Sequence, residues 1–335
     1  MARHVVWIGD CLESLRQMED QSVNCCVTSP PYFGLRDYGV DGQIGLEDTP
    51  DAYVGRLVEV FREVRRVLRD DGTLWLNLGD SYAAARGGTH QPAETLAGGK
   101  GGKADDGGRV NRDRHDGYNP TRNAPAIGLK HKDLIGIPWR VAFALQADGW
   151  YLRQDVIWSK PNPMPESVKD RCTKAHEYLF MLTKSARYFY DAEAIKEPSA
   201  DLEKSTARYK SAFGGAKNEA LLATDQVHTR PIGMREFDGK RNRRSVWTVT
   251  TKPFAGAHFA TFPPDLIEPC ILAGCPKGGV VLDPFGGSGT TAGVAIKHGR
   301  NAILCELNPD YAGLIDARVR SIAGDTADLF WEAAE

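Results

Sequence analysis

Short runs of apolar, β-rich residues alternate along the chain with segments whose apolar residues recur every three or four positions. The runs are typical of buried strands, and the recurring segments of amphipathic helices. Residues 52–68 form the clearest helix, and Gly72 is expected to end it. Strands that alternate with helices favour a mostly parallel, twisted α/β sheet. The expected strands are 4–8, 23–28, 73–78, 151–158, 178–183, 188–190, 280–283 and 301–306, and the other expected helices are 11–18, 137–148, 265–273 and 290–298.

Two polar regions interrupt this alternation. Residues 86–132 are rich in glycine and almost free of large apolar side chains, which predicts a flexible insertion. Their arginines give a positive bias, and both a solvated loop and a DNA-contacting loop fit that composition. Residues 196–252 carry many lysines and arginines against few acids. We therefore expect one core built from residues 1–85, 133–195 and 253–335, with insertions at 86–132 and 196–252.

The composition is that of an ordinary globular protein, with 41% hydrophobic and 26% charged residues among 335. A formal net charge of -2 says nothing by itself about binding partners, so any positively charged surface that binds nucleic acid must be local. Residues 1–16 lack the apolar core of a signal peptide and no segment has the length of a membrane span, which predicts a cytoplasmic protein without a membrane partner. The scattered cysteines form no C-x-x-C pair, so we expect neither a metal site nor a disulfide framework.

A glycine-rich turn follows the expected strand 280–283. The sequence Asp283-Pro284-Phe285-Gly286-Gly287-Ser288-Gly289-Thr290-Thr291 allows close backbone approach to a ligand and opens a helix, whose N-terminus favours polar or anionic groups. The Gly-Lys-Ser/Thr of an ATPase phosphate loop is missing. Glu306, after the next strand, is placed to bind ribose hydroxyls and would repel a 2′-phosphate. The turn indicates an adenosine-type cofactor, the alternative being a structural turn with surface acids.

A second motif, Ser29-Pro30-Pro31-Tyr32, follows the expected strand 23–28. Two prolines make a rigid exit that can aim the Ser29 hydroxyl and the Pro30 carbonyl into one small space. Both groups accept hydrogen bonds, as an exocyclic amino group requires, and Tyr32 offers a face for base stacking. The alternative is a Pro-Pro strand terminator with a core tyrosine.

These two motifs resemble those of DNA amino-methyltransferases. Ser29-Pro30-Pro31-Tyr32 is similar to their catalytic motif, and the glycine-rich turn to their S-adenosylmethionine motif. The catalytic motif comes first, which is the permuted order of the beta class, and the basic region 196–252 lies where that class carries its target-recognition region. Weaker similarities at Gly9-Asp10 and at residues 76–80, 158–163 and 258–263 extend the resemblance over most of the chain outside the two insertions.

The resemblance implies a circularly permuted, Rossmann-like methyltransferase fold with S-adenosyl-L-methionine as cofactor. It implies catalytic roles for Ser29, Pro30, Pro31 and Tyr32. It also implies double-stranded DNA as substrate and a bacterial or phage origin, and it is compatible with a homodimer and with a cognate restriction endonuclease. The implied cofactor-binding residues are Asp10, Phe262, Pro263, Asp283, Phe285, Gly286, Gly287, Gly289, Thr290, Thr291 and Glu306, and the expected DNA contacts, to phosphate or to base, are Arg241, Arg243 and Arg244.

The implied reaction is methylation of a flipped base at its amino nitrogen. In the resembling family a serine in the first motif position is commoner among N4-cytosine enzymes and an aspartate among N6-adenine enzymes. Ser29 therefore favours cytosine N4, with adenine N6 as the alternative. A carbon-5 cytosine enzyme needs a cysteine after proline, and Pro269-Cys270 lies in an expected core helix.

Three other classes compete with this interpretation. Amino-methyltransferases that act on RNA or on protein glutamine usually place the cofactor motif first. A nicotinamide-dependent oxidoreductase leaves the motif at Ser29–Tyr32 unexplained. A non-catalytic DNA-binding regulator would keep the fold without turnover, and the intact pair of motifs argues against it.

Overall fold

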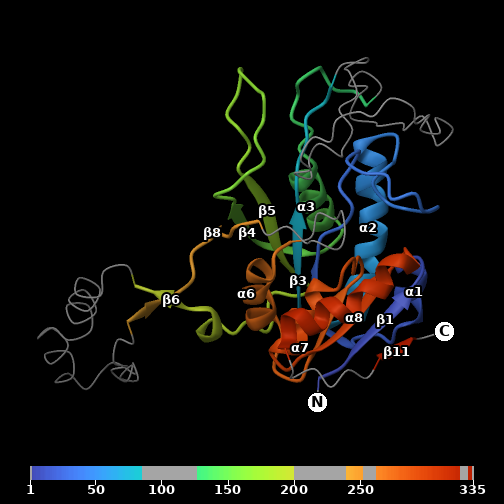
Figure 1. Cartoon of the computed structure of the whole chain (residues 1–335), viewed down its shortest axis with the longest axis vertical. Helices are drawn as coiled ribbons and strands as arrows, with labels where there is room; N and C mark the ends of the chain where they lie inside the picture. The colour runs from blue at the N-terminus through green and yellow to red at the C-terminus, as the bar shows by residue number, and fades with distance from the viewer. Residues whose placement is uncertain (1, 85–126, 200–238, 252–261, 325–330, 334–335) are drawn as a thin grey trace, which may run out of the picture. The chain divides into compact units, whose positions relative to one another are not determined.

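The computed structural model describes residues 2–84, 127–199, 239–251, 262–324 and 331–333 (Figure 1). Most of the insertion 86–132, most of the basic region 196–252 and residues 258–261 of the family-like segment 258–263 lie outside the described residues. The described chain divides into two compact units, 1–190 with 245–335, and 191–244. Each unit is treated by itself below.

Nine strands of the described residues form one sheet in the first unit, in the order β11-β1-β10-β9-β2-β3-β5-β4-β8. All neighbouring strands are parallel except at β5, which runs antiparallel to both β3 and β4. The strands are β1 His4–Ile8, β2 Val23–Thr28, β3 Leu68–Leu78, β4 Tyr151–Ser159, β5 His176–Thr183, β8 Val246–Thr248, β9 Val280–Asp283, β10 Asn301–Glu306 and β11 Trp331–Ala333. The prediction of a mostly parallel α/β sheet is confirmed.

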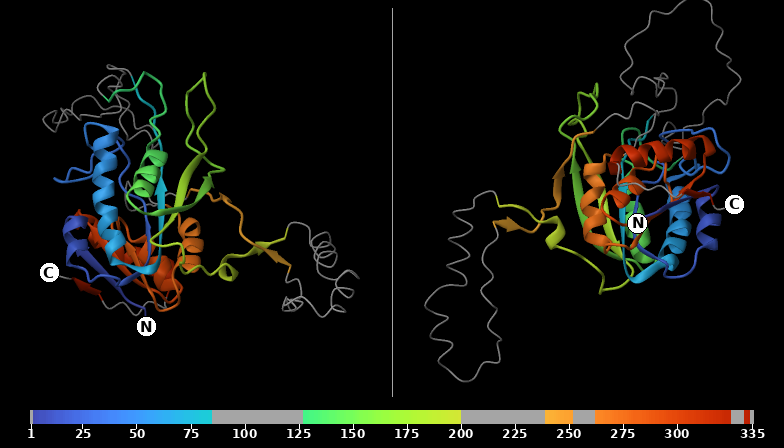
Figure 2. Two further views of the ribbon diagram at one scale, coloured as in Figure 1. Left: turned by 180° about the vertical axis from the view of Figure 1, so that it is seen from behind. Right: turned by 60° about the horizontal axis from the view of Figure 1, so that its bottom comes forward.

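Helices cover both faces of this sheet, as Figures 1 and 2 show. One layer contains α1 Cys11–Gln17, α2 Pro50–Val67 and α3 Ile137–Ala147, and the other α6 Pro264–Gly274, α7 Thr290–Lys297 and α8 Pro309–Ala323. Polar caps fix three of the helix starts, because the side chains of Asp10, Thr49 and Asn308 accept hydrogen bonds from first-turn amides of α1, α2 and α8. None of the helices in the described part of the chain is long and apolar enough to cross a membrane.

The amphipathic stripe of α2 explains how one layer seals the core. Its residues Tyr53, Leu57, Val60, Phe61 and Val64 are completely buried. Within α6, Cys270 is also completely buried, which agrees with its interpretation as a core residue and not as a nucleophile.

Two expectations about local structure were wrong. Helix α2 ends at Val67, because Leu68 turns into an extended conformation and pairs with Val23 at the start of β3, so Gly72 lies inside a strand. Residues 188–190 form no strand, since β3 and β4 already occupy both sides of β5. Helix α8 and the edge strands β8 and β11 were not predicted at all.

The second unit, 191–244, contains the single-turn helix η3 Glu193–Ile195 and a two-stranded antiparallel ribbon, β6 Glu197–Pro198 with β7 Lys240–Arg241. Its bounds differ from those of the basic region 196–252, because Val246–Thr248 pairs with β4 in the main sheet.

The contact between α6 and the sheet predicts the effect of a single added methyl group. A Cβ on Gly274 would lie 2.4 Å from Thr73 Oγ1 and 2.8 Å from Trp75 Nε1, so Gly274→Ala forces buried atoms apart. We expect the free energy of unfolding, measured by urea denaturation, to fall by about 1–3 kcal/mol. Gly55→Ala is the matched control, because that helical position is exposed with open space around it and should gain about 0.5–1 kcal/mol. Equal stability of the two variants would contradict this packing.

Candidate active site

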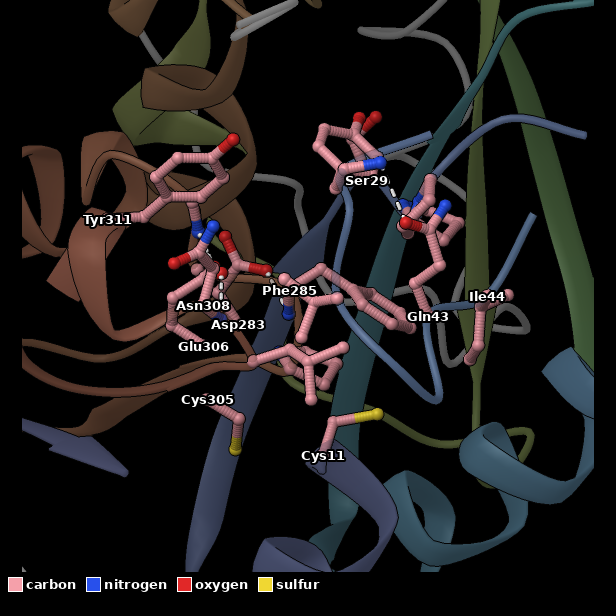
Figure 3. A pocket seen from close by; sticks show the side chains of 18 of the residues that line it. Cys11, Ser29, Gln43, Ile44, Asp283, Phe285, Cys305, Glu306, Asn308 and Tyr311 are labelled. Atoms are coloured by element: carbon pink, nitrogen blue, oxygen red, sulfur yellow. Dashed lines mark hydrogen bonds between the residues drawn. The ribbon is translucent and has the colours of Figure 1, made fainter. Parts of the chain in front are cut away.

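A cavity opens at the edge of the sheet where β1, β2, β9 and β10 end, as expected for the carboxyl ends of parallel strands. Its empty space, with the open solvent at its mouth included, is about 1200 Å³. Figure 3 shows Asp283, Glu306, Asn308 and Tyr311 on one side of this space, with Ser29 and Gln43 on the other. The cavity thus brings the two sequence motifs together. Of the predicted site residues, Asp10, Ser29, Pro30, Pro31, Tyr32, Phe262, Asp283, Phe285, Gly286, Gly287, Thr290 and Glu306 line it.

The Asp283 carboxyl group joins the two motifs through buried hydrogen bonds. Its Oδ1 accepts from the Thr28 hydroxyl at 2.6 Å and from the Phe285 amide at 3.1 Å. Its Oδ2 accepts from the Thr291 hydroxyl at 2.6 Å. Burial raises the pKa of Asp283 from 3.8 to about 7, against the opposing effect of these donors. Asp283 therefore fixes the end of β9 to the end of β2, after which the motif Ser29-Pro30-Pro31-Tyr32 begins.

Glu306 at the end of β10 holds the glycine-rich turn. Its two carboxylate oxygens accept from the amides of Gly287 at 2.7 Å and Asn308 at 2.9 Å. Burial raises the pKa of Glu306, and the backbone donors oppose that shift. Each oxygen retains a further lone pair that can accept a ribose hydroxyl. Gly287 and Gly289 have φ values of 51° and 86°, a conformation in which glycine is favoured.

Two buried hydroxyl groups at the start of α7 have no hydrogen-bond partner among the described residues. Ser288 Oγ and Thr290 Oγ1 line the cavity, and their residues are 1% and 3% exposed. Buried hydroxyls are normally paired, so these two fit a polar group of a bound ligand. Three predicted site residues, Pro263, Gly289 and Thr291, do not line the cavity: Thr291 donates to Asp283, and the other two precede α6 and α7.

Asp10 lines the cavity and also has a structural role. Its Oδ1 accepts from the amides of Leu12 at 2.8 Å and Glu13 at 3.1 Å, which caps α1. Its Oδ2 lies 3.6 Å from a guanidinium nitrogen of Arg56. The capping geometry explains why an acid follows β1, whatever it contributes to cofactor binding.

The turn formed by Ser29-Pro30-Pro31-Tyr32 is held by contacts behind Ser29. The Pro31 carbonyl accepts a hydrogen bond from the buried Tyr53 hydroxyl at 2.8 Å. The Tyr32 ring packs on Gly79, where an added Cβ would lie 2.5 Å from a ring carbon. Leu78-Gly79 at the end of β3 therefore supports the ring that was predicted to stack on a base.

The Tyr32 hydroxyl belongs to a cluster of polar side chains that the sequence revealed only in part. The Tyr32 hydroxyl donates to Glu177 Oε2 at 2.8 Å and lies 3.2 Å from Asn77 Oδ1. Asn77 and Lys160 belong to the segments 76–80 and 158–163, which show weaker similarity to the family, whereas Glu177 was missed. Glu177 reaches this edge because β5 is antiparallel and begins where its neighbours end. A strand expected to start at residue 178 gave no signal of that direction.

A loop after the catalytic motif was also missed as part of the site. Arg36, Tyr38 and Gln43 line the cavity, together with Tyr311 of α8. Gln43 braces the loop, since its Oε1 accepts from the Tyr38 amide at 2.7 Å and its Nε2 donates to the Arg36 carbonyl at 3.1 Å. The loop lacks helical or strand periodicity, so only its position directly after Tyr32 could have indicated a role.

The three arginines expected to contact DNA lie in the second unit. Glu197 Oε1 accepts from Arg241 Nε at 2.9 Å and from Arg244 Nε at 2.8 Å, and Arg243 stands between them in the sequence. Glu197, on strand β6 of the ribbon, therefore orients the guanidinium groups of Arg241 and Arg244.

Solved structures of similar shape define the class of fold. The PvuII DNA methyltransferase, described as cytosine-N4-specific, has a TM-score of 0.59 at 17% identity, covering 99% of this chain and 95% of its own. A putative DNA modification methylase from Thermus thermophilus, complexed with S-adenosyl-L-methionine, has a TM-score of 0.56 at 21% identity, covering 98% and 99%. The fold is that of the Rossmann-like methyltransferases that use S-adenosyl-L-methionine.

Sequence comparison gives the family. The DNA methylase family of N6 and N4 methyltransferases matches residues 23–316. Type II methyltransferase M.Cfr9I of Citrobacter freundii is 48% identical over 332 residues, covering 97% of this chain and 90% of its own. Type II methyltransferase M.SmaI of Serratia marcescens is 45% identical over 319 residues, covering 93% and 89%. The chain belongs to this family and is an S-adenosylmethionine-dependent DNA methyltransferase.

The buried Asp283 predicts a pH dependence of stability. Its carboxyl group ionises near pH 4 in the unfolded chain and near pH 7 in the folded one, so between these values the folded chain binds more protons. The stability that Asp283 contributes is full below about pH 4 and is lost as the pH rises through about 7. Asp283→Asn removes this titration. We expect the free energy of unfolding of the wild type, relative to the variant, to fall by on the order of a few kcal/mol across that range in urea denaturation. A constant or rising difference would contradict the burial of this acid.

Proposed function

We propose that this enzyme methylates the exocyclic N4 of cytosine in double-stranded DNA after flipping the base into the cavity. The observation that carries the proposal is the position of Ser29 and Pro30 in the same cavity as Asp283 and Glu306. A base in this space meets hydrogen-bond acceptors on one side and the cofactor turn on the other. Extrusion of the base costs a few kcal/mol, which stacking on Tyr32 would offset in part.

The chain's own residues hold the cofactor in this proposal. The Glu306 carboxylate accepts hydrogen bonds from the ribose hydroxyls of the cofactor. The Ser288 and Thr290 hydroxyls, which have no partner among the described residues, bind the polar methionine end beside the N-terminus of α7. When bound, S-adenosyl-L-methionine supplies an electrophilic methyl group. The Ser29 hydroxyl and the Pro30 carbonyl accept hydrogen bonds from the amino group of the base and so orient the nitrogen lone pair. Catalysis then rests on positioning and electrostatics, without a covalent enzyme intermediate.

The choice of cytosine over adenine rests on the first residue of the catalytic motif. Ser29 offers a neutral hydroxyl, where an aspartate would offer a charged acceptor. The likeness to a protein described as cytosine-N4-specific concerns the fold and adds only weak support. Adenine N6 is the alternative that the same acceptors could serve.

DNA recognition is assigned to the region between the motifs. Arg241 lies on the ribbon of the second unit and Arg243 and Arg244 follow it, and such positively charged groups contact phosphates or base edges. The relatives M.Cfr9I and M.SmaI are named type II methyltransferases, which supports a role in a restriction-modification system with a cognate endonuclease. Since both relatives come from bacteria, we place the enzyme in a bacterial cytoplasm. A homodimer stays a prediction from the family resemblance.

The reaction product tests the proposal. Purified protein is incubated with S-adenosyl-L-methionine and mixed-sequence duplex DNA, which is then digested to nucleosides for mass spectrometry. We expect N4-methylcytosine. N6-methyladenine would keep the mechanism and overturn the choice of base, and methylation of RNA or protein alone would reject the proposed substrate.

Ser29→Ala tests the acceptor role. Loss of one preorganised hydrogen-bonding group should lower the single-turnover rate of methyl transfer roughly 100-fold while cofactor and DNA affinities stay unchanged. Ser22→Ala is the matched control, because the Ser22 hydroxyl donates to the Glu19 carbonyl at the opposite end of β2. Wild-type turnover in the Ser29 variant would exclude this serine from the reaction.

Glu306→Gln tests the cofactor site. Replacing the charged acceptor should raise the Kd for S-adenosyl-L-methionine roughly 10- to 100-fold, as measured by isothermal titration calorimetry. Glu59→Gln on the exposed side of α2 provides the same chemical change beside Arg56 and should leave that Kd unchanged. Equal affinities in the two variants would remove Glu306 from the cofactor site.

A further inference from the structure

Glu177 stands at the end of a chain of hydroxyl groups that leads to the catalytic serine. Ser29 Oγ donates to the Tyr32 hydroxyl oxygen at 3.5 Å, and the Tyr32 hydroxyl donates to Glu177 Oε2 at 2.8 Å. These three residues come from two segments that lie far apart in the sequence, and the antiparallel β5 brings them together. The proposed function above assigns no role to Glu177.

The neighbours of Glu177 fix its carboxylate in place. Lys160 forms an ion pair with Oε1, and the side chains of Lys160 and Glu177 are only 18% and 16% exposed. The Lys160 ammonium also lies 4.1 Å from the centre of the Trp158 ring. Asn77 Nδ2 donates to Glu177 Oε2 at 3.3 Å and to the Tyr178 carbonyl at 3.1 Å. The carboxylate is thus held from several sides and directed at Tyr32.

The direction of the hydrogen bonds follows from this arrangement. An ionised carboxylate can only accept, so the single Tyr32 hydroxyl proton points to Glu177. The Tyr32 oxygen then offers its lone pair to the Ser29 hydroxyl proton. With its proton directed at Tyr32, Ser29 presents only lone pairs to the cavity. Burial, followed by the charge of Glu177, raises the pKa of Tyr32 well above its usual value, so the phenol keeps its proton.

We propose that Glu177, held by Lys160, is a positioning residue that orients the Tyr32 and Ser29 hydroxyls so that Ser29 accepts a hydrogen from the amino group of the target base. This inference rests on the proposed function, and it names the group that sets the polarity of that site. A glutamine at position 177 could donate to the Tyr32 oxygen, which would leave Asn77 Oδ1, at 3.2 Å, and Ser29 Oγ, at 3.5 Å, to compete for the tyrosine proton. Whenever that proton turns to Ser29, the serine proton points at the amino group and opposes its binding.

A double-mutant cycle between Glu177→Gln and Tyr32→Phe tests the proposal. The measured quantity is the single-turnover rate of methyl transfer to duplex DNA with saturating S-adenosyl-L-methionine. We expect Glu177→Gln to lower this rate roughly 10- to 100-fold with the tyrosine present, and to have no further effect once phenylalanine has removed the hydroxyl. The Kd values for cofactor and DNA should not change. A wild-type rate in Glu177→Gln, or equal effects of this substitution in both backgrounds, would overturn the proposal.

Glu166→Gln is the matched control. Glu166 lies on the connection between β4 and β5 and is paired with Arg171 at 2.7 Å, and within the described part of the chain it makes no hydrogen bond to Tyr32. It should keep the wild-type rate. Lys160→Met is a second variant in case Glu177→Gln does not fold, which thermal melting will show. It should lower the rate with tyrosine at position 32 and not with phenylalanine, and any other pattern contradicts the inference.

The nucleoside produced by the wild type distinguishes a failure of the proposed function from a failure of the role of Glu177. If the wild type methylates no amino group of DNA, the proposed function fails, whatever the variants do. If it does so and the cycle shows no coupling, the role of Glu177 fails alone.

Discussion

The buried carboxyl group of Asp283 is the interaction on which the rest of the site depends. It accepts hydrogen bonds from Thr28 at the end of β2, from Phe285 in the glycine-rich turn and from Thr291 in the helix that follows. A buried acid is costly unless its oxygens are hydrogen-bonded, and the three donors lower this cost, although burial still raises the pKa of Asp283 to about 7. Because the donors come from both motifs, the motifs keep a fixed spacing even though Asp283 and Thr28 lie 255 positions apart in the sequence.

The second constraint is the direction of β5. A wholly parallel sheet would place only strand ends at the functional edge. The antiparallel β5 adds its first residues there, and His176 and Glu177 face the ends of β4 and β3. Two parts of this edge of the sheet therefore carry different chemical groups. The glycine-rich turn and Glu306 form the side suited to the cofactor, whereas Ser29, Tyr32 and Glu177 form the side suited to the base.

Much of this arrangement could be predicted from the sequence, and the failures have physical reasons. The strands β1, β2, β9 and β10 were predicted to the residue, because buried parallel strands are short apolar runs between polar turns. The two motifs could be placed in one cavity because strand ends meet at one edge. Residues 188–190 were assigned to a strand from their tyrosines, and only the pairing of β5 shows that no place beside it was left. Glu177 and the loop around Gln43 carry no local pattern, since their roles arise from tertiary contacts.

The central claim is that cofactor and target amino group meet between Glu306 and Ser29. The most direct test is a crystal structure of the enzyme with an unreactive S-adenosylmethionine analogue and a duplex that it methylates. We expect a flipped base stacked on Tyr32, with its amino nitrogen within hydrogen-bonding distance of Ser29 Oγ and the Pro30 carbonyl, and the ribose of the analogue hydrogen-bonded to Glu306. A base that stays paired in the duplex, or an amino group bound away from Ser29, would contradict it.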